Sequence, residues 1–173
     1  MNKKIKNFGF TLVELITVIG LLAIMVIYIT SEFASSQDAA KISLARSFLL
    51  KSFPSAISSH LLSNGGCVFG ADTTATGVEL LNRGVAAGTP WKPGSQLAAN
   101  RGQAAYTVWS AVLASVSGSD SISRKVLQVT YPLENASNPV MAGDEIVKSL
   151  TGKPGILSVL NTAGTLTINY LCS

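Results

Sequence analysis

The sequence is poor in the side chains that most enzymes and metal proteins use. Only 13% of its 173 residues are charged, and it has one histidine, His60, and two cysteines; soluble domains average about 25% charged residues. Two cysteines with one histidine give no zinc-ligand spacing, and no Walker A, GxGxxG or GxSxG sequence occurs. We therefore expect no enzyme activity, no metal and no cofactor, and we interpret His60 as a surface or interface residue.

The shortage of charge is concentrated near the N-terminus. Between residues 10 and 31, Glu14 is the only charged residue in 22 positions. An apolar run of about 20 residues is long enough to cross a bilayer as a helix. Three lysines precede the run: Lys3, Lys4 and Lys6. They are typical of a cytoplasmic flank that orients the rest of the chain outside.

Glu14 is out of place in such a run. A carboxylate inside a bilayer costs about 2.5–3.5 kcal/mol on insertion scales, so it is a functional candidate by default. A secretory signal peptide would be shorter and would end in an Ala-x-Ala-like site, and a plain membrane anchor would leave Glu14 unexplained. Cleavage between Gly9 and Phe10 would create a cation, the α-amino group of Phe10. A neighbouring copy of the chain could bring that amine to Glu14.

The stretch KIKNFG|FTLVELITVIGLLAI resembles the class III signal of type IV pilins and their pseudopilin relatives. The shared features are a short basic leader, Gly9 before the cut, Phe10 after it, and Glu14 close behind. The resemblance implies that a prepilin peptidase cleaves after Gly9 and methylates the amine of Phe10. It also implies a bacterial inner-membrane precursor that inner-membrane assembly machinery builds into an extracellular pilus. In that helical homopolymer, Glu14 would pair with the Phe10 amine of a neighbour.

The sequence departs from many family members at two positions. Ser31 stands where they have a helix-bending proline, and Ala23 stands where they have glycine. The missing proline and the wide cysteine spacing favour the type IVb branch, whereas the short leader and Phe10 favour type IVa, so the subclass stays open. A major pilin, a minor pilin and a type II secretion pseudopilin share this signal. A further alternative is an uncleaved, single-pass membrane protein whose head binds a ligand.

A helical pattern continues beyond the apolar run. One apolar stripe recurs at spacings of three and four residues: Ile42, Ala45, Leu49, Phe53 and Ile57. Asn64-Gly65-Gly66 supplies suitable C-cap chemistry, and Pro54 predicts a kink because it removes a backbone donor. We divide the chain into a cleaved leader (1–9), a membrane and filament-core half of the helix (10–31), its amphipathic half (32–66) and a globular head (67–173).

The head has the pattern of a small sheet with short helices. Lys125–Tyr131 and a hairpin over residues 155–171 are predicted strands, and Asp144–Leu150 is a predicted helix. Apolar residues from Ala105 to Val116 recur at helical spacing, with Trp109 in the core. The expected fold class is therefore α+β: a long N-terminal helical spine, membrane-spanning in its first half, packed on a small antiparallel sheet.

The two cysteines, Cys67 and Cys172, lie near the two ends of the head. In an exported domain such a pair indicates one disulfide, here joining the first residues of the head to its last strand.

A ligand for the head, such as DNA or a host surface, is not identified by the sequence. Without the three leader lysines, the chain has ten Lys and Arg residues and nine Asp and Glu residues, which gives a net charge of +1. The high pI therefore does not support nucleic-acid binding. The cations of the head are scattered along the sequence, which favours a solvated surface: Lys92, Arg101, Arg124, Lys125 and Lys153. Adhesion, motility, DNA uptake and secretion all stay open as uses of a filament.

Overall fold

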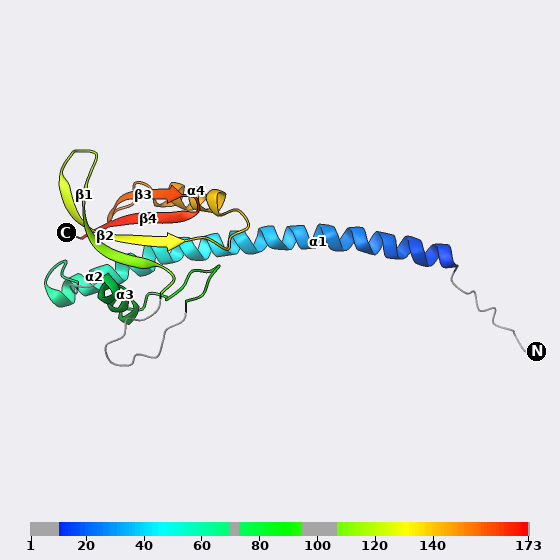
Figure 1. Ribbon diagram of the computed structural model, residues 1–173, viewed down its shortest axis with the longest axis horizontal. Coiled ribbons are helices and arrows are strands. Elements are labelled where there is room, and N and C mark those ends of the chain that lie inside the picture. The colour runs from blue at the N-terminus through cyan, green and yellow to red at the C-terminus, as the bar shows by residue number, and fades with distance from the viewer. Residues whose placement is uncertain (1–10, 70–72, 95–106, 173) are drawn as a thin grey trace, which may run out of the picture. The chain divides into compact units, whose positions relative to one another are not determined.

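A computed structural model describes residues 11–69, 73–94 and 107–172 (Figure 1). The chain divides into two compact units, Met1–Gln37 and Asp38–Ser173. Helix α1 (Leu12–Ser47) contributes to both, since its residues through Gln37 belong to the first unit and the rest to the second. The apolar run is therefore helical, as the sequence predicts.

In the second unit the helical stripe lines the core. The π-helical segment η1 (Phe48–Ser52) and helix α2 (Phe53–Asn64) follow α1 directly. Gly65, at φ 69°, ends α2 in the left-handed conformation that glycine adopts without a Cβ clash. All five residues of the predicted stripe are buried: Ile42, Ala45, Leu49, Phe53 and Ile57.

The helix is perturbed where proline predicts it, and the form of the perturbation is π-helical. Pro54 occupies the first turn of α2, immediately after η1. The backbone N–H of Phe53 bonds to the carbonyl of Phe48, five residues back. The hydrogen bond of Phe53 therefore spans five residues, as in a π-helix, where an α-helical bond spans four. This change comes just before Pro54, whose nitrogen has no hydrogen to donate.

The sheet has four strands, β1 (Ser110–Ser117), β2 (Ser123–Pro132), β3 (Ile156–Thr162) and β4 (Thr165–Leu171). Their order is β1-β2-β4-β3, and every pair is antiparallel (Figure 1). The predicted strand at β2 and the predicted hairpin β3–β4 are confirmed. Ala163 and Gly164 turn the hairpin with φ values of 51° and 86°, as a two-residue type I′ turn requires.

The predicted helix around Trp109 is wrong over the residues that the structure describes there. Residues 110–117 form β1, which pairs with β2 without interruption from Ser110↔Thr130 to Ser117↔Ser123. The β-branched residues Val112 and Val116 favour a strand, and the ladder satisfies backbone groups of β2 that would otherwise be left at an edge. Trp109 is buried as predicted, and its indole N–H donates to the carbonyl of Ala86.

One face of the sheet carries the core. Alternate residues of the two central strands are buried on it: Leu127, Val129 and Tyr131 on β2, and Leu166, Ile168 and Tyr170 on β4. Phe53 of α2 reaches these strands, with its ring 4.9 Å from that of Trp109 and stacked at 6.1 Å on that of Tyr170. The core therefore joins the helical stripe to the central strands.

Two further helices complete the second unit, α3 (Thr73–Asn82) and α4 (Pro139–Leu150). Helix α4 begins five residues earlier than predicted, because Asn138 accepts a hydrogen bond from the backbone of Met141 and Pro139 fits the first turn. It lies close to β3, since a Cβ on Gly143 would clash with the side chain of Asn161. The described residues thus form a mixed helix-and-sheet fold, in agreement with the α+β prediction at that level.

Candidate functional site

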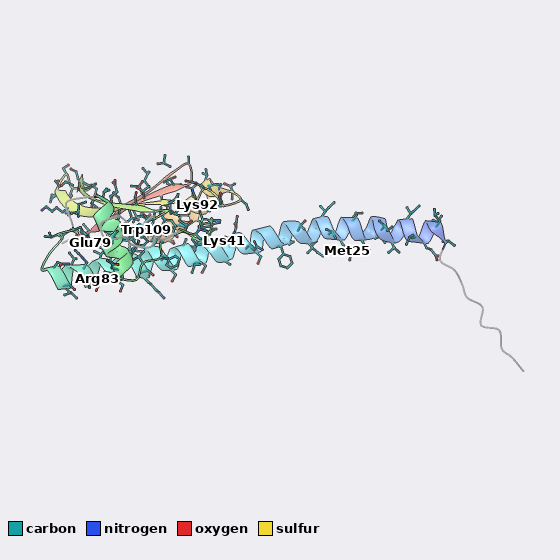
Figure 2. The ribbon with its side chains drawn as sticks, turned by 60° about the horizontal axis from the view of Figure 1, so that its bottom comes forward. Met25, Lys41, Glu79, Arg83, Lys92 and Trp109 are labelled. Atoms are coloured by element: carbon teal, nitrogen blue, oxygen red, sulfur yellow. A yellow bond between two sulfur atoms is a disulfide. The ribbon has the colours of Figure 1, made fainter. Side chains whose placement is uncertain are left out.

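The N-terminal half of α1 has an apolar surface that the chain does not bury. Within the described residues, Leu12–Thr30 is the one helix long and apolar enough to cross a bilayer. Its large side chains are exposed, and Met25, for example, projects from the helix with 63% of its surface accessible (Figure 2). An apolar surface of this extent marks a contact with membrane or protein.

Glu14 lies in the first turn of this helix and has local partners. Its Oε2 accepts hydrogen bonds from the backbone N–H of Thr11 at 3.0 Å and from the Thr11 hydroxyl at 2.9 Å. The Thr11 hydroxyl oxygen in turn accepts from the Glu14 backbone N–H at 3.2 Å. This reciprocal arrangement is a capping box, which satisfies donors that every helix start leaves without intrahelical partners.

The sequence pattern for the cap, Thr-x-x-Glu before an apolar run, is present in TLVE (residues 11–14). Sequence reasoning missed it because it considered only charged partners for Glu14. The cap gives the carboxylate a use within a single chain, and the predicted cleavage after Gly9 would leave both of its residues in the chain. The two hydrogen bonds from Thr11 lower the free-energy cost of placing the Glu14 carboxylate in an apolar helix, but they do not neutralise its charge.

The other residues predicted to act at this end lie outside the described residues: Lys3, Lys4, Lys6, Gly9 and Phe10. The structure does not place them relative to Glu14, so their roles in orientation, cleavage and methylation stay predictions.

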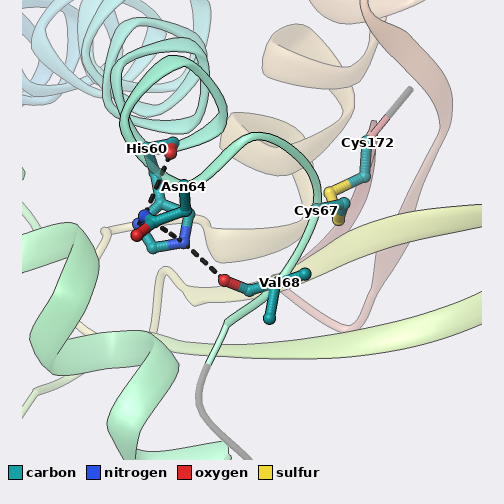
Figure 3. The surroundings of a disulfide bond; sticks show 5 residues. All are labelled: His60, Asn64, Cys67, Val68 and Cys172. Carbon is teal, nitrogen blue, oxygen red and sulfur yellow. Dashed lines mark hydrogen bonds between the residues drawn. A yellow bond between two sulfur atoms is a disulfide. The ribbon is translucent and has the colours of Figure 1, made fainter.

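The two cysteines are brought together as the sequence predicts. Cys67 and Cys172 are joined with their Cα atoms 5.5 Å apart, within the usual disulfide range (Figure 3). Cys67 follows the end of α2, and Cys172 directly follows β4. The bridge links positions 105 residues apart and ties the last strand to the segment that leaves α2.

His60, which the sequence suggested as a surface or interface residue, is buried, with 4% of its surface accessible. Its ring stacks on that of Phe69. Its Nε2 lies 2.7 Å from the carbonyl oxygen of Val68 (Figure 3). Since a carbonyl only accepts, Nε2 donates, and Nδ1 accepts from the amide of Asn64 at 3.0 Å. His60 therefore holds the segment that carries Cys67. His60 lies three residues after Ile57 and so continues the apolar stripe, and this spacing is the sequence signal that indicates its burial.

Asp38 fastens two loops of the head to the helix. Its carboxylate accepts hydrogen bonds from the indole N–H of Trp91 at 3.2 Å and from the backbone N–H of Ser137 at 2.9 Å. Partial burial raises the pKa of Asp38, but the bonds from Ser137 and Trp91 and the charge of Lys41 outweigh it. The pKa therefore lies below its ordinary value, and the ionised form is the one the fold prefers.

Replacing Asp38 with asparagine is expected to lower the free energy of unfolding by about 1–2 kcal/mol at pH 7, because an amide offers one acceptor to two donors. A depressed folded-state pKa contributes stability above the unfolded value of about 3.9, and that contribution is lost as pH falls through the folded value. The difference in free energy of unfolding between the wild type and the variant, measured by urea titration, should therefore narrow below about pH 4. A difference that stays constant to pH 2 would contradict this role. Glu134→Gln, which removes only an exposed ion pair with Lys92, serves as the control.

The cations of the head are partly engaged by acids. Lys92 pairs with Glu134 at 3.2 Å. The guanidinium of Arg124 donates hydrogen bonds to both carboxylate oxygens of Asp120, beside the β1–β2 turn. The hydrogen bonds from Arg124 hold the pKa of Asp120 far below its usual range. Arg101 lies outside the described residues. Neutralised cations offer less to a phosphate backbone, so these pairs do not favour DNA binding.

Comparisons of the chain with protein-family models, with curated proteins and with solved structures give no match.

Proposed function

We propose that the chain is a type IV pilin-like structural subunit that polymerises through its N-terminal helix into an extracellular filament. The observation that carries the proposal is a membrane-length helix with an exposed apolar surface and one carboxylate in its first turn. In the membrane, lipid covers this surface before assembly. In the filament, the same helices of neighbouring copies cover it.

Glu14 sets the axial register in this proposal. A prepilin peptidase cuts between Gly9 and Phe10 and methylates the new amine, which then pairs with Glu14 of an adjacent copy. The apolar surroundings strengthen the attraction between the two charges and make any stagger that leaves Glu14 unpaired costly. The disulfide-closed head, which forms the rest of the chain, supplies the filament surface. This role requires no catalytic residue.

A single-pass anchor with a ligand-binding head is the second candidate, and the capping box favours it. Because Thr11 already engages Glu14 within one chain, the carboxylate has a use that requires neither cleavage nor a neighbour. A minor pilin or secretion pseudopilin would share every feature of the first proposal except abundance in the filament.

The intact mass and the N-terminal residue of protein sheared from cells distinguish these candidates. A filament subunit is expected to begin at N-methylated Phe10, to be abundant in the sheared fraction and to be two hydrogens lighter than the reduced chain. Protein that still begins at Met1 and stays in the membrane fraction would overturn the pilin proposal. A processed chain found only in trace amounts in the sheared fraction would identify a minor component.

A further inference from the structure

The carbonyl of Leu49 lies where the helix changes its hydrogen-bond pattern. Its α-helical donor, the N–H of Phe53, bonds to Phe48. The next residue, which would be the π-helical donor, is Pro54, and its nitrogen carries no hydrogen. Leu49 is fully buried. A buried carbonyl without a donor costs about as much as a lost hydrogen bond, so this group needs a partner from elsewhere in the fold.

Tyr170 of β4 provides that partner. Its hydroxyl donates to the Leu49 carbonyl at 2.8 Å, across 121 residues of sequence. Tyr170 is 1% exposed, and its ring lies parallel to that of Phe53, at an interplanar angle of 10°. Burial raises the pKa of the phenol well above its ordinary value, so the hydroxyl keeps its proton over the physiological range.

We propose that Leu49, Pro54 and Tyr170 form a register lock between the helix and the last strand. Pro54 prevents the helix from satisfying Leu49 locally, and only β4 in its native register brings the Tyr170 hydroxyl to that carbonyl. A slip of one residue would turn Tyr170 to the opposite face of the sheet. A slip of two residues would move its hydroxyl by about 6.6 Å.

The lock also positions the disulfide. Cys172 lies two residues after Tyr170, and the register that places the hydroxyl on Leu49 places Cys172 beside Cys67. Tyr170 and Pro54 are thus positioning residues for the closure of the head. The lock concerns the head alone and holds whether or not the chain polymerises, so its test is independent of the proposed filament.

The first test is Tyr170→Phe in the full-length, disulfide-intact chain in detergent, measured by urea unfolding. The variant leaves the Leu49 carbonyl unpaired and is expected to lower the folded-to-unfolded ratio about 5- to 30-fold. Tyr131→Phe is the matched control, because Tyr131 is equally buried on the same sheet face. Among the described residues its hydroxyl has no hydrogen-bond partner. That control should show no loss of stability.

The decisive comparison repeats Tyr170→Phe in a Pro54→Ala background. Alanine restores an N–H at position 54 that can reach Leu49 or free Phe53 to do so, and the cost of losing the hydroxyl should fall to less than about twofold. The lock would be overturned if Tyr170→Phe lost as much stability in the Pro54→Ala background as in the wild type. It would also be overturned if Tyr131→Phe lost as much stability as Tyr170→Phe.

Amide hydrogen exchange gives a site-specific readout that does not depend on the Pro54 variant. The N–H of Phe53 should exchange faster in Tyr170→Phe than the global loss of stability explains, because the π-helical turn loses its anchor. In Tyr131→Phe the same amide should exchange at the wild-type rate. Exchange at Phe53 that follows only the global stability would count against the lock.

Discussion

For the proposed filament, replacing Glu14 with glutamine is expected to abolish assembly while leaving the helix cap intact. Glutamine at this position of a capping box reaches back to the helix start as glutamate does, so Thr11 keeps its partner. The variant loses only the charge. Leaving one member of a pair buried without the other costs about 3–5 kcal/mol, which lowers the assembly equilibrium about 100-fold or more.

Sheared filament yield, normalised to the membrane pool of the protein, measures this effect. Glu14→Gln, Glu14→Ala and Glu14→Val should all insert into the membrane and all fail to assemble. Thr11→Val breaks the cap but keeps the carboxylate, and it should assemble. Normal filaments from Glu14→Gln together with defective ones from Glu14→Ala would show that Glu14 acts as a cap and would remove the charge pair from the mechanism.

Removing the disulfide is expected to have the largest effect on the stability of the head. In the chain-entropy model, a bridge closing a loop of roughly 100 residues contributes about 4.7 kcal/mol, and losing a native bridge commonly costs about 2–5 kcal/mol. The observed bridge spans 105 residues. Against a total stability of about 5–15 kcal/mol, Cys172→Ala should leave the head marginal, sensitive to protease and low in abundance.

The double variant Cys67→Ala/Cys172→Ala separates the bridge from the packing of the side chains. If the bridge carries the effect, either single variant and the double variant should lose the same free energy of unfolding, because one substitution already opens the bridge. Reduction of the wild-type protein should lower its stability by a similar amount. Losses that add across the two sites would show that packing dominates.

Most of the helical and strand pattern was readable from the sequence because it depends on local chemistry. The apolar stripe that includes Leu49 and Phe53 predicted a buried helix face, Gly65 predicted its end, and the turn before β4 predicted a hairpin. Each signal lies within a short stretch of sequence, and each predicted feature is present in the structure. Helix α4 starts earlier than predicted because Asn138 caps it and Pro139 fits its first turn.

The segment around Trp109 shows why a local pattern can fail. Its apolar residues have helical spacing, yet residues 110–117 form an edge strand against β2. Backbone hydrogen bonds to β2, the next strand along the chain, outweighed the helical spacing, because β1 and β2 form a hairpin joined by residues 118–122. His60 was misjudged for a similar reason, since the carbonyl of Val68 and the ring of Phe69 that make its burial favourable lie beyond the helix end.

The sequence by itself determined the apolar run with its single carboxylate, the helical stripe that follows it, and the number of cysteines available for pairing. These depend on residue type and spacing alone. Only the tertiary structure decided that Asp38 holds two loops and that the Tyr170 hydroxyl donates to the carbonyl of Leu49. The physical reason is that a buried polar group must find a partner wherever the fold brings one, and that distance in space is not written in the spacing of residues along the chain.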